Sequence, residues 1–248
     1  MLEINALTDV GKVRKINEDS FATYSDDKYS YAIVADGMGG HLAGEVASAM
    51  AVELICGYVK EHLTDELDRF QAQEVLRRAF VDANDKIYKY SLENERVMGM
   101  GTTATMCMIR GGYIIIAHVG DSRAYMAGDN ITQLTKDHSY VQELVKLGLI
   151  TPEEAKHHPH RNRITRAMGV EPGVKADAVV KPYNGESILL CTDGLYGEIE
   201  DGELLSIINE NSAEAAVKKL TALALERGGA DNITTVVLKG VKLGKSTL

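Results

Sequence analysis

Two runs of β-branched and apolar residues stand only a short turn apart, at 102–109 (TTATMCMI) and 113–119 (YIIIAHV). Arg110, Gly111 and Gly112 separate them. Such a short connection can join only antiparallel strands, because parallel neighbours need a crossover of about a dozen residues or more. The sequence therefore predicts an antiparallel hairpin. Similar strand-like runs occur at 30–35, 187–192 and 234–238.

Helical periodicity of apolar residues occurs at 44–59, 74–90 and 213–226. Because the predicted strands do not alternate strictly with these helices, we expect an α+β fold with antiparallel sheets, not a doubly wound parallel sheet. A chain of 248 residues with 45% hydrophobic content can bury one large core. No repeat, low-complexity tract or linker divides it, so we expect one domain over 1–248.

The segment 137–168 differs from the rest of the chain. It holds four of the seven histidines and two of the four prolines. Ser139 with Gln142 has the spacing of a capping box, and Thr151-Pro152 with Glu154 repeats that pattern, which predicts two short helices near 140–157. This polar, broken stretch between strands is typical of an excursion from the core.

Composition narrows the function classes. The formal net charge of −9 disfavours binding to nucleic acid or to an anionic membrane surface. Cys56, Cys107 and Cys191 stand far apart, which fits neither a zinc site nor a disulfide framework. No secretory signal is recognisable at the start, and the longest uncharged stretch, 97–109, is too short to span a bilayer. We expect a cytoplasmic protein without a membrane segment.

Aspartates stand where strand-like runs begin or end. They are Asp36, Asp121, Asp193 and Asp231. Asp-Gly is common in hairpin turns, so Asp36 and Asp193, each followed by glycine, are individually consistent with turn chemistry. However, a helical pattern follows Asp36, and the apolar run LLSII follows Asp193, so neither pair simply joins two alternating strands.

These aspartates predict a metal site. If the last strand runs antiparallel to the strands that end in Asp36 and Asp193, its opening residue Asp231 lies on the same rim. Three converging carboxylates repel one another unless they are protonated or neutralised. An all-oxygen ligand set selects a hard ion such as Mg²⁺ or Mn²⁺.

The neighbouring residues suit phosphate chemistry. Gly37 lets the backbone carbonyl approach an ion, and the glycines before His41 allow a turn that presents this histidine beside the site as a proton donor. In RKINED (14–19), the guanidinium of Arg14 suits a phosphate group, and Glu18 can join the metal shell directly or through water. Taken alone, this run is also typical of a solvated charged loop.

Other chemistries fit the sequence poorly. The GKS near the C-terminus has Lys239 where a P-loop needs its first glycine, and no cysteine has the arginine that a cysteine-based phosphatase needs six residues later. Ser122 in GDS lacks the downstream D-x-x-H of GDS-type esterases. His157 and His158 are adjacent and point apart on any regular element, so a solvated loop is favoured over a zinc site.

The ordered set of motifs resembles the metal-dependent PPM protein phosphatases (type 2C), especially their compact bacterial members. The matching segments span nearly the whole chain: RKINED (14–19), ADGMGGH (35–41), GTTAT (101–105), HVGDSRAY (118–125), TRAMG (165–169), CTDGLY (191–196) and GGADNIT (228–234). This resemblance implies a four-layer α-β-β-α sandwich of two antiparallel sheets flanked by helices, with a two-metal centre at one end. It also implies a variable flap at about 137–168.

The resemblance also implies roles for individual residues. Asp36 bridges two ions, Mn²⁺ or Mg²⁺, while Asp193 and Asp231 complete one shell and the Gly37 carbonyl with Glu18 serves the other. Asp121 helps Asp193 to hold a third, weaker ion. Arg14 grips the phosphate, and His41 is the general acid.

The expected activity is hydrolysis of phosphoserine and phosphothreonine in proteins by a water activated between two metal ions. A matching serine/threonine kinase is implied by the resemblance, and we expect a monomer. Two alternatives remain open: a non-catalytic sensor of phosphoproteins with the same fold, and a hydrolase of small phosphomonoesters. The first should have lost a bridging carboxylate, whereas this chain retains Asp36, Asp193 and Asp231.

Overall fold

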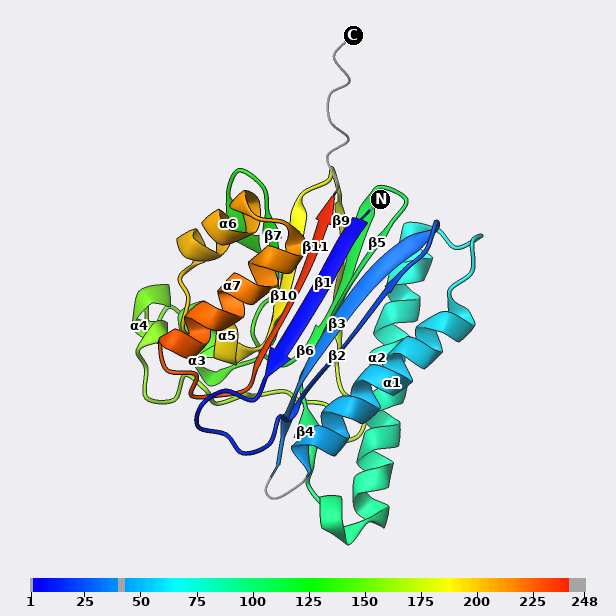
Figure 1. Ribbon diagram of the computed structural model, residues 1–248. Coiled ribbons are helices and arrows are strands. Elements are labelled where there is room, and N and C mark those ends of the chain that lie inside the picture. The colour runs from blue at the N-terminus through cyan, green and yellow to red at the C-terminus, as the bar shows by residue number, and fades with distance from the viewer. Residues whose placement is uncertain (1, 40–42, 241–248) are drawn as a thin grey trace.

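The structure, a computed structural model, describes residues 2–39 and 43–240. Two antiparallel sheets pack face to face, and helices cover their outer faces (Figure 1). The first sheet has the strand order β1-β11-β10-β7-β8, and the second has the order β2-β3-β5-β6-β9, with β4 paired to the end of β3. The expected α+β sandwich of four layers is confirmed.

The strands and helices fall in the following order along the chain: β1 (Leu2–Asp9), β2 (Asp19–Ser25), β3 (Tyr29–Met38), α1 (Gly44–His62), α2 (Arg69–Glu93), the 3₁₀ helix η1 (Glu95–Val97), β4 (Gly101–Thr102), β5 (Ala104–Arg110), β6 (Tyr113–Val119), β7 (Arg123–Ala127), β8 (Ile131–Gln133), α3 (Tyr140–Lys146), α4 (Pro152–Lys156), β9 (Asp177–Pro182), β10 (Ser187–Cys191), α5 (Asp193–Tyr196), α6 (Asp201–Glu210), α7 (Ala213–Glu226) and β11 (Ile233–Gly240).

Three hydrophobic layers hold the sandwich together. Between the sheets, side chains such as Val34 and Ile116 of one sheet meet Leu190 and Val236 of the other. Outside the second sheet, α1 and α2 bury a layer that includes Phe80, and outside the first sheet α6 and α7 bury another. Alternate residues of the central strands therefore face different apolar layers, which explains why β5, β6 and β10 are buried along almost their whole length.

The predicted hairpin is present, since β5 pairs antiparallel with β6 from Arg110 and Tyr113 onward. The prediction of a single strand over 102–109 is wrong in one respect, because the chain breaks at Thr103 into β4 and β5. There the Thr103 N–H donates to Asp36 O (2.8 Å), and Thr103 Oγ1 accepts from Asp36 N–H (2.9 Å). The break therefore places threonine polar groups around the backbone of Asp36.

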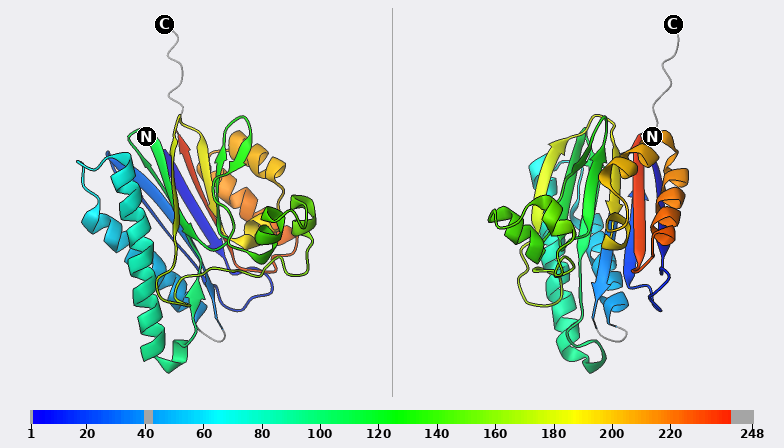
Figure 2. Two further views of the ribbon diagram at one scale, coloured as in Figure 1. Left: turned by 180° about the vertical axis from the view of Figure 1, so that it is seen from behind. Right: turned by 90° about the vertical axis from the view of Figure 1, so that its left-hand side faces the viewer.

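The segment 137–168 carries the two short helices expected from its capping residues. Ser139 Oγ accepts from Gln142 N–H (3.3 Å) at the start of α3, and Thr151 with Glu154 forms a complete capping box at α4. Figure 2 shows both helices projecting beside the sandwich, at the end where β6 and β10 finish.

Within residues 2–39 and 43–240, the helices are all too short or too polar to cross a membrane.

Candidate metal centre

The acidic residues singled out from the sequence meet at one end of the sandwich. Because β10 and β11 pair antiparallel, Asp193 after β10 and Asp231 before β11 lie at the same end of the first sheet. Asp36 approaches the same end from β3, which belongs to the second sheet, so the three aspartates come from both sheets. The shared edge is the end of the whole sandwich, at the bottom of Figure 1.

The backbone of Asp36 is fixed on both sides. Its carbonyl accepts from Thr103 N–H (2.8 Å) and from Thr102 Oγ1 (2.9 Å), and its N–H donates to Thr103 Oγ1. Thr103 Oγ1 in turn lies 2.7 Å from Ser122 Oγ, next to Asp121. Buried hydroxyl groups thus hold the main chain of Asp36 and connect it to Ser122, the neighbour of Asp121.

Gly37 and Glu18 lie against the N-terminus of α1. Gly37 N–H donates to Glu18 O (3.0 Å), and a side chain at position 37 would meet Gly44 O at 2.1 Å, so only glycine fits. The Glu18 carboxylate packs on Gly44, since a Cβ there would lie 2.3 Å from its Oε1. The predicted partners Gly37 and Glu18 are therefore neighbours.

Arg14 and Asp231 form an ion pair at the rim. Arg14 Nη2 donates to Asp231 Oδ2 over 2.7 Å, and the Asp231 Oδ1 accepts from Asn232 N–H (2.8 Å). Asn232 also binds the loop before β2, where its Oδ1 accepts from Glu18 N–H and its Nδ2 donates to Ile16 O. The motif GGADNIT therefore fixes both Asp231 and the loop that carries Arg14.

Asp19 is a member of the cluster that the sequence analysis missed. It opens β2 directly opposite Asp36 of β3, so their side chains share one face. Its buried Oδ2 accepts from Thr234 Oγ1 (2.6 Å) and Thr192 Oγ1 (2.8 Å). The available signal was the alternation in DSFATYS, which identifies 19–25 as a strand and not as the end of a charged loop.

The carboxyl pKa values show how crowded the site is. Burial raises the pKa of Asp36 well above its usual range, and neighbouring carboxylates raise it further, led by Asp193 and then by Asp19, Asp121 and Asp231. Burial, followed by the charge of Asp193, also raises the pKa of Asp121 to about 8. For Asp19 and Asp193, burial is again the main cause, and their pKa values rise to about 7 and about 6. Such repulsion identifies a site built for cations.

The donor set fits hard divalent ions. The Oδ1 atoms of Asp19 and Asp193 are buried and have no hydrogen-bond partner among the described residues. Buried carboxylate oxygens without partners are costly unless an ion neutralises them. Because the side-chain donors of the cluster are all carboxylates, the site suits Mg²⁺ or Mn²⁺ better than zinc or copper. The predicted proton donor His41 lies outside the described residues.

The comparisons with known proteins agree with this geometry. The family model for protein phosphatase 2C matches residues 12–235. The chain belongs to the protein phosphatase 2C family. The resemblance expected from the motifs is thereby confirmed.

Relatives of this protein phosphatase 2C match it over nearly its whole length. It is 38% identical over 236 residues to the serine/threonine phosphatase stp of Listeria welshimeri. This match covers 94% of this chain and 93% of the relative. It is 37% identical over 242 residues to the protein phosphatase PhpP of Streptococcus pneumoniae, with 96% and 97% covered.

Solved structures match the fold closely. The serine/threonine phosphatase Stp1 from Staphylococcus aureus superposes with a TM-score of 0.90 at 37% identity, covering 96% of this chain and 95% of that one. The catalytic domain of the phosphatase PstP in complex with two manganese ions gives a TM-score of 0.82 at 34% identity, covering 97% and 98%. A relative of the same fold therefore holds the number and kind of ions expected for this chain.

Proposed function

We propose that this protein phosphatase 2C hydrolyses phosphoserine and phosphothreonine in proteins, with two divalent ions held at the end of the sandwich. The observation that carries this proposal is the convergence of aspartates from both sheets, where partial burial and neighbouring carboxylates raise the pKa values of Asp36 and Asp193. The names of its relatives favour protein substrates over the two alternatives, a phosphoprotein sensor and a hydrolase of small phosphomonoesters.

Each side chain of the cluster has a role in this proposal. Asp36 would serve both ions, Asp193 and Asp231 would complete the shell of one, and the Gly37 carbonyl with Glu18 would serve the other. Asp121 with Asp193 would hold a third, weaker ion. When bound, the ions supply Lewis acidity and lower the pKa of a water molecule toward neutrality. Asp19 Oδ1 has no hydrogen-bond partner in the described part of the chain, so it provides an acceptor that can orient such a water.

Arg14 and His41 act on the substrate. The Arg14 side chain is about half exposed and uses Nη2 for Asp231, so its other N–H groups remain available to the oxygens of a phosphate. His41, as an imidazolium, would give a proton to the departing serine or threonine oxygen. The chain's own residues thus place the phosphate and protonate the leaving group.

Release of phosphate from a phosphothreonine peptide tests the proposal directly. We expect turnover with Mn²⁺ and with Mg²⁺, and loss of turnover when a chelator removes the metal, because the carboxylates alone cannot activate water. The measurement is inorganic phosphate released per enzyme over time. Turnover that persists after the metal has been removed and its removal verified would exclude the metal-dependent mechanism.

Substitution of His41 tests the proton donor. His41→Ala should slow hydrolysis of phosphopeptides and alkyl phosphates by about 10²-fold or more, but should slow aryl phosphates much less, since a good leaving group needs little protonation. The measurement is kcat for both substrate classes. His62→Ala is the matched control, because His62 is exposed at the C-terminal end of α1. Equal slowing of both substrate classes by His41→Ala would exclude the acid role.

The remaining proposals concern the oligomeric state, cellular compartment and partners of the enzyme, and the segment 137–168. We propose a monomeric, cytoplasmic protein of one domain over 1–248 that binds neither nucleic acid nor membranes and opposes a serine/threonine kinase in signalling. We also propose that 137–168 is a flap beside the metal centre. In support, both ends of this segment lie close to Asp121, since His138 N–H donates to Gly120 O and Thr165 N–H donates to His138 O.

A further inference from the structure

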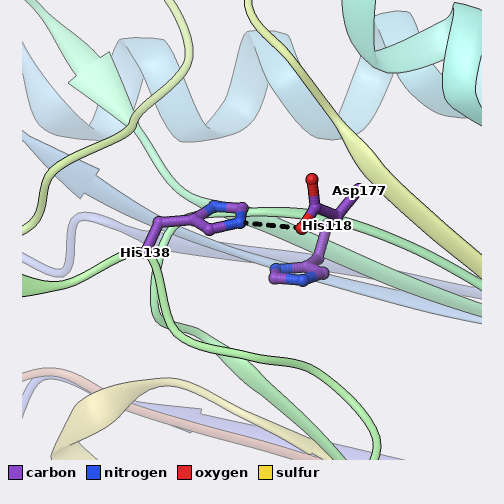
Figure 3. A group of neighbouring side chains, drawn as sticks. All are labelled: His118, His138 and Asp177. Atoms are coloured by element: carbon purple, nitrogen blue, oxygen red, sulfur yellow. Dashed lines mark hydrogen bonds and ion pairs between the residues drawn. The ribbon is translucent and has the colours of Figure 1, made fainter. Parts of the chain in front are cut away.

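A second group of metal-ligand side chains lies next to the turn that precedes Asp121. His118 at the end of β6, His138 and Asp177 at the start of β9 place ligand atoms within 4.8 Å of one another (Figure 3). Both histidines are buried, with 5% and 7% of their surfaces exposed. None of the motifs considered in the sequence analysis explains this group.

The geometry of the group disfavours a metal ion. The rings of His118 and His138 are stacked at 4.6 Å with only 13° between their planes. Lone pairs of stacked imidazoles lie in parallel planes, so they do not converge on one ion. A cation is already present, because Arg166 Nη1 lies 3.0 Å from Asp177 Oδ1 and 2.8 Å from His138 Nε2. Burial lowers the pKa of both histidines, that of His118 to about 4, so both rings are neutral near pH 7.

His138 holds the turn that precedes Asp121. Gly120 N–H donates to His138 Nδ1 (3.0 Å), and His138 N–H donates to Gly120 O (2.9 Å). Both polar groups of Gly120 are thus bound by one residue. Gly120 has φ +104°, and a Cβ there would lie 2.5 Å from Thr103 Cγ2, so this turn has little freedom to adjust by other means.

His138 also closes the base of the segment 137–168. Its carbonyl accepts from Thr165 N–H (2.8 Å), and Tyr140 N–H donates to Arg163 O (2.8 Å). The Arg166 side chain returns from the far end of the segment to the His138 ring. One residue therefore binds the Asp121 turn with its ring and joins the two ends of the segment with its backbone.

From these contacts we propose that His138 is a positioning residue that fastens the turn carrying Asp121 to the base of the 137–168 segment. Gly120 N–H can donate to Nδ1 only when the ring proton of His138 is on Nε2, where Asp177 Oδ2 at 3.4 Å can accept it. Arg166 Nη1, 2.8 Å from Nε2, then gives its two hydrogens to Lys175 O and Asp177 Oδ1, each at 3.0 Å. The inference rests on the proposed function only where it treats Asp121 as a metal ligand. The attachment of the turn can be measured without that assumption.

Paired amide substitutions separate the two ring nitrogens. The side-chain oxygen of asparagine can take the place of Nδ1, whereas the amide of glutamine lies where Nε2 lies. We expect Gly120 amide hydrogen exchange to accelerate about tenfold in His138→Gln and to change little in His138→Asn, because only asparagine keeps the acceptor. The matched control is His118→Leu, which removes the stacked ring whose Nδ1 binds nothing among the described residues.

Metal binding gives a second readout. Supporting partners of a metal ligand typically alter metal affinity 10–100-fold when they are lost. In a Mn²⁺ titration followed by calorimetry, we expect His138→Gln to weaken the weakest site by about tenfold, and His138→Asn and His118→Leu to leave it within about threefold of wild type. Equal effects of the asparagine and glutamine variants on Gly120 exchange would overturn the positioning role.

The unsubstituted protein supplies a test that does not depend on how variants fold. The ¹⁵N shifts of the His138 ring should show a neutral ring with its proton on Nε2, and a proton on Nδ1 would overturn the proposal. Asp121→Asn separates this question from the proposed function. If that variant leaves the Mn²⁺ titration unchanged, Asp121 is not a ligand, while Gly120 exchange and the His138 tautomer still decide whether the ring holds the turn.

Discussion

Replacing Asp36 with asparagine should lower kcat/KM for a phosphothreonine peptide by about 10³-fold or more while leaving the protein folded. Asparagine keeps the shape of the side chain but removes the charge proposed to bridge both ions, and loss of several kcal/mol of metal-centred stabilisation corresponds to a rate loss of this order. In the metal-free protein, the same change removes a carboxyl group whose ionisation is opposed by burial, by Asp193 and by Asp19. The melting temperature in chelator should therefore stay constant or rise. Kinetics at saturating Mn²⁺ and thermal melts in chelator measure the two effects.

Asp137→Asn is the control for the effect of Asp36→Asn on the melting temperature. The Asp137 side chain is 9% exposed, but its charge is neutralised by Arg123, which donates from Nη2 to Asp137 Oδ2 over 2.7 Å. Asp137→Asn leaves the Arg123 charge without its full partner, so it should lower the melting temperature where Asp36→Asn does not. If Asp36→Asn destabilises the metal-free protein as much as Asp137→Asn, the Asp36 charge is part of the fold and its assignment to the ions fails.

The sequence predicted the parts of this site that follow from short-range pattern. The apolar runs before Asp36 and Asp193 are uninterrupted because β3 and β10 are buried on both faces, and such runs end where the chain reaches solvent. An aspartate at the end of a buried strand can therefore be recognised from the sequence alone. Its convergence with Asp231 followed from antiparallel pairing of β10 and β11.

The parts that were missed depend on contacts between distant segments. Asp19 was not recognised because the sequence of β2 is polar and alternating. Its place in the cluster depends on its pairing with Asp36 and on the hydroxyl groups of Thr192 and Thr234, which are all distant in the sequence. The break of the 102–109 run at Thr103 also cannot be recognised from the local sequence, since threonine is common in strands. Only the hydrogen bonds of Thr103 to the backbone of Asp36 separate β4 from β5. The same holds for His138, which is 18 residues from the glycine it binds.

In the absence of metal, the protein should lose stability as the pH rises from about 6.5 to about 8.5. The pKa values of Asp19 and Asp121 in the folded state, about 7 and about 8, lie far above the value near 4 of an unfolded chain. Between those limits the folded protein binds more protons than the unfolded protein, so the free energy of unfolding falls with pH. The depressed pKa values of His118 and His138 act in the opposite direction, but only below about pH 6.5, where the unfolded histidine titrates. We expect the melting temperature in chelator to fall by about 5 °C or more across this window.

Saturating Mn²⁺ should reverse this trend, because bound ions favour the ionised carboxylates and stabilise the folded state by mass action. The increase in melting temperature caused by Mn²⁺ should therefore be larger at about pH 8.5 than at about pH 6.5. Asp36→Asn in chelator is the control, and its decline with pH should be shallower because one repelling carboxylate is absent. A melting temperature in chelator that is flat or rises across the window would mean that these aspartates are already ionised and balanced without metal. The crowded carboxylates would then need no cations for their neutralisation, whatever the enzyme's activity.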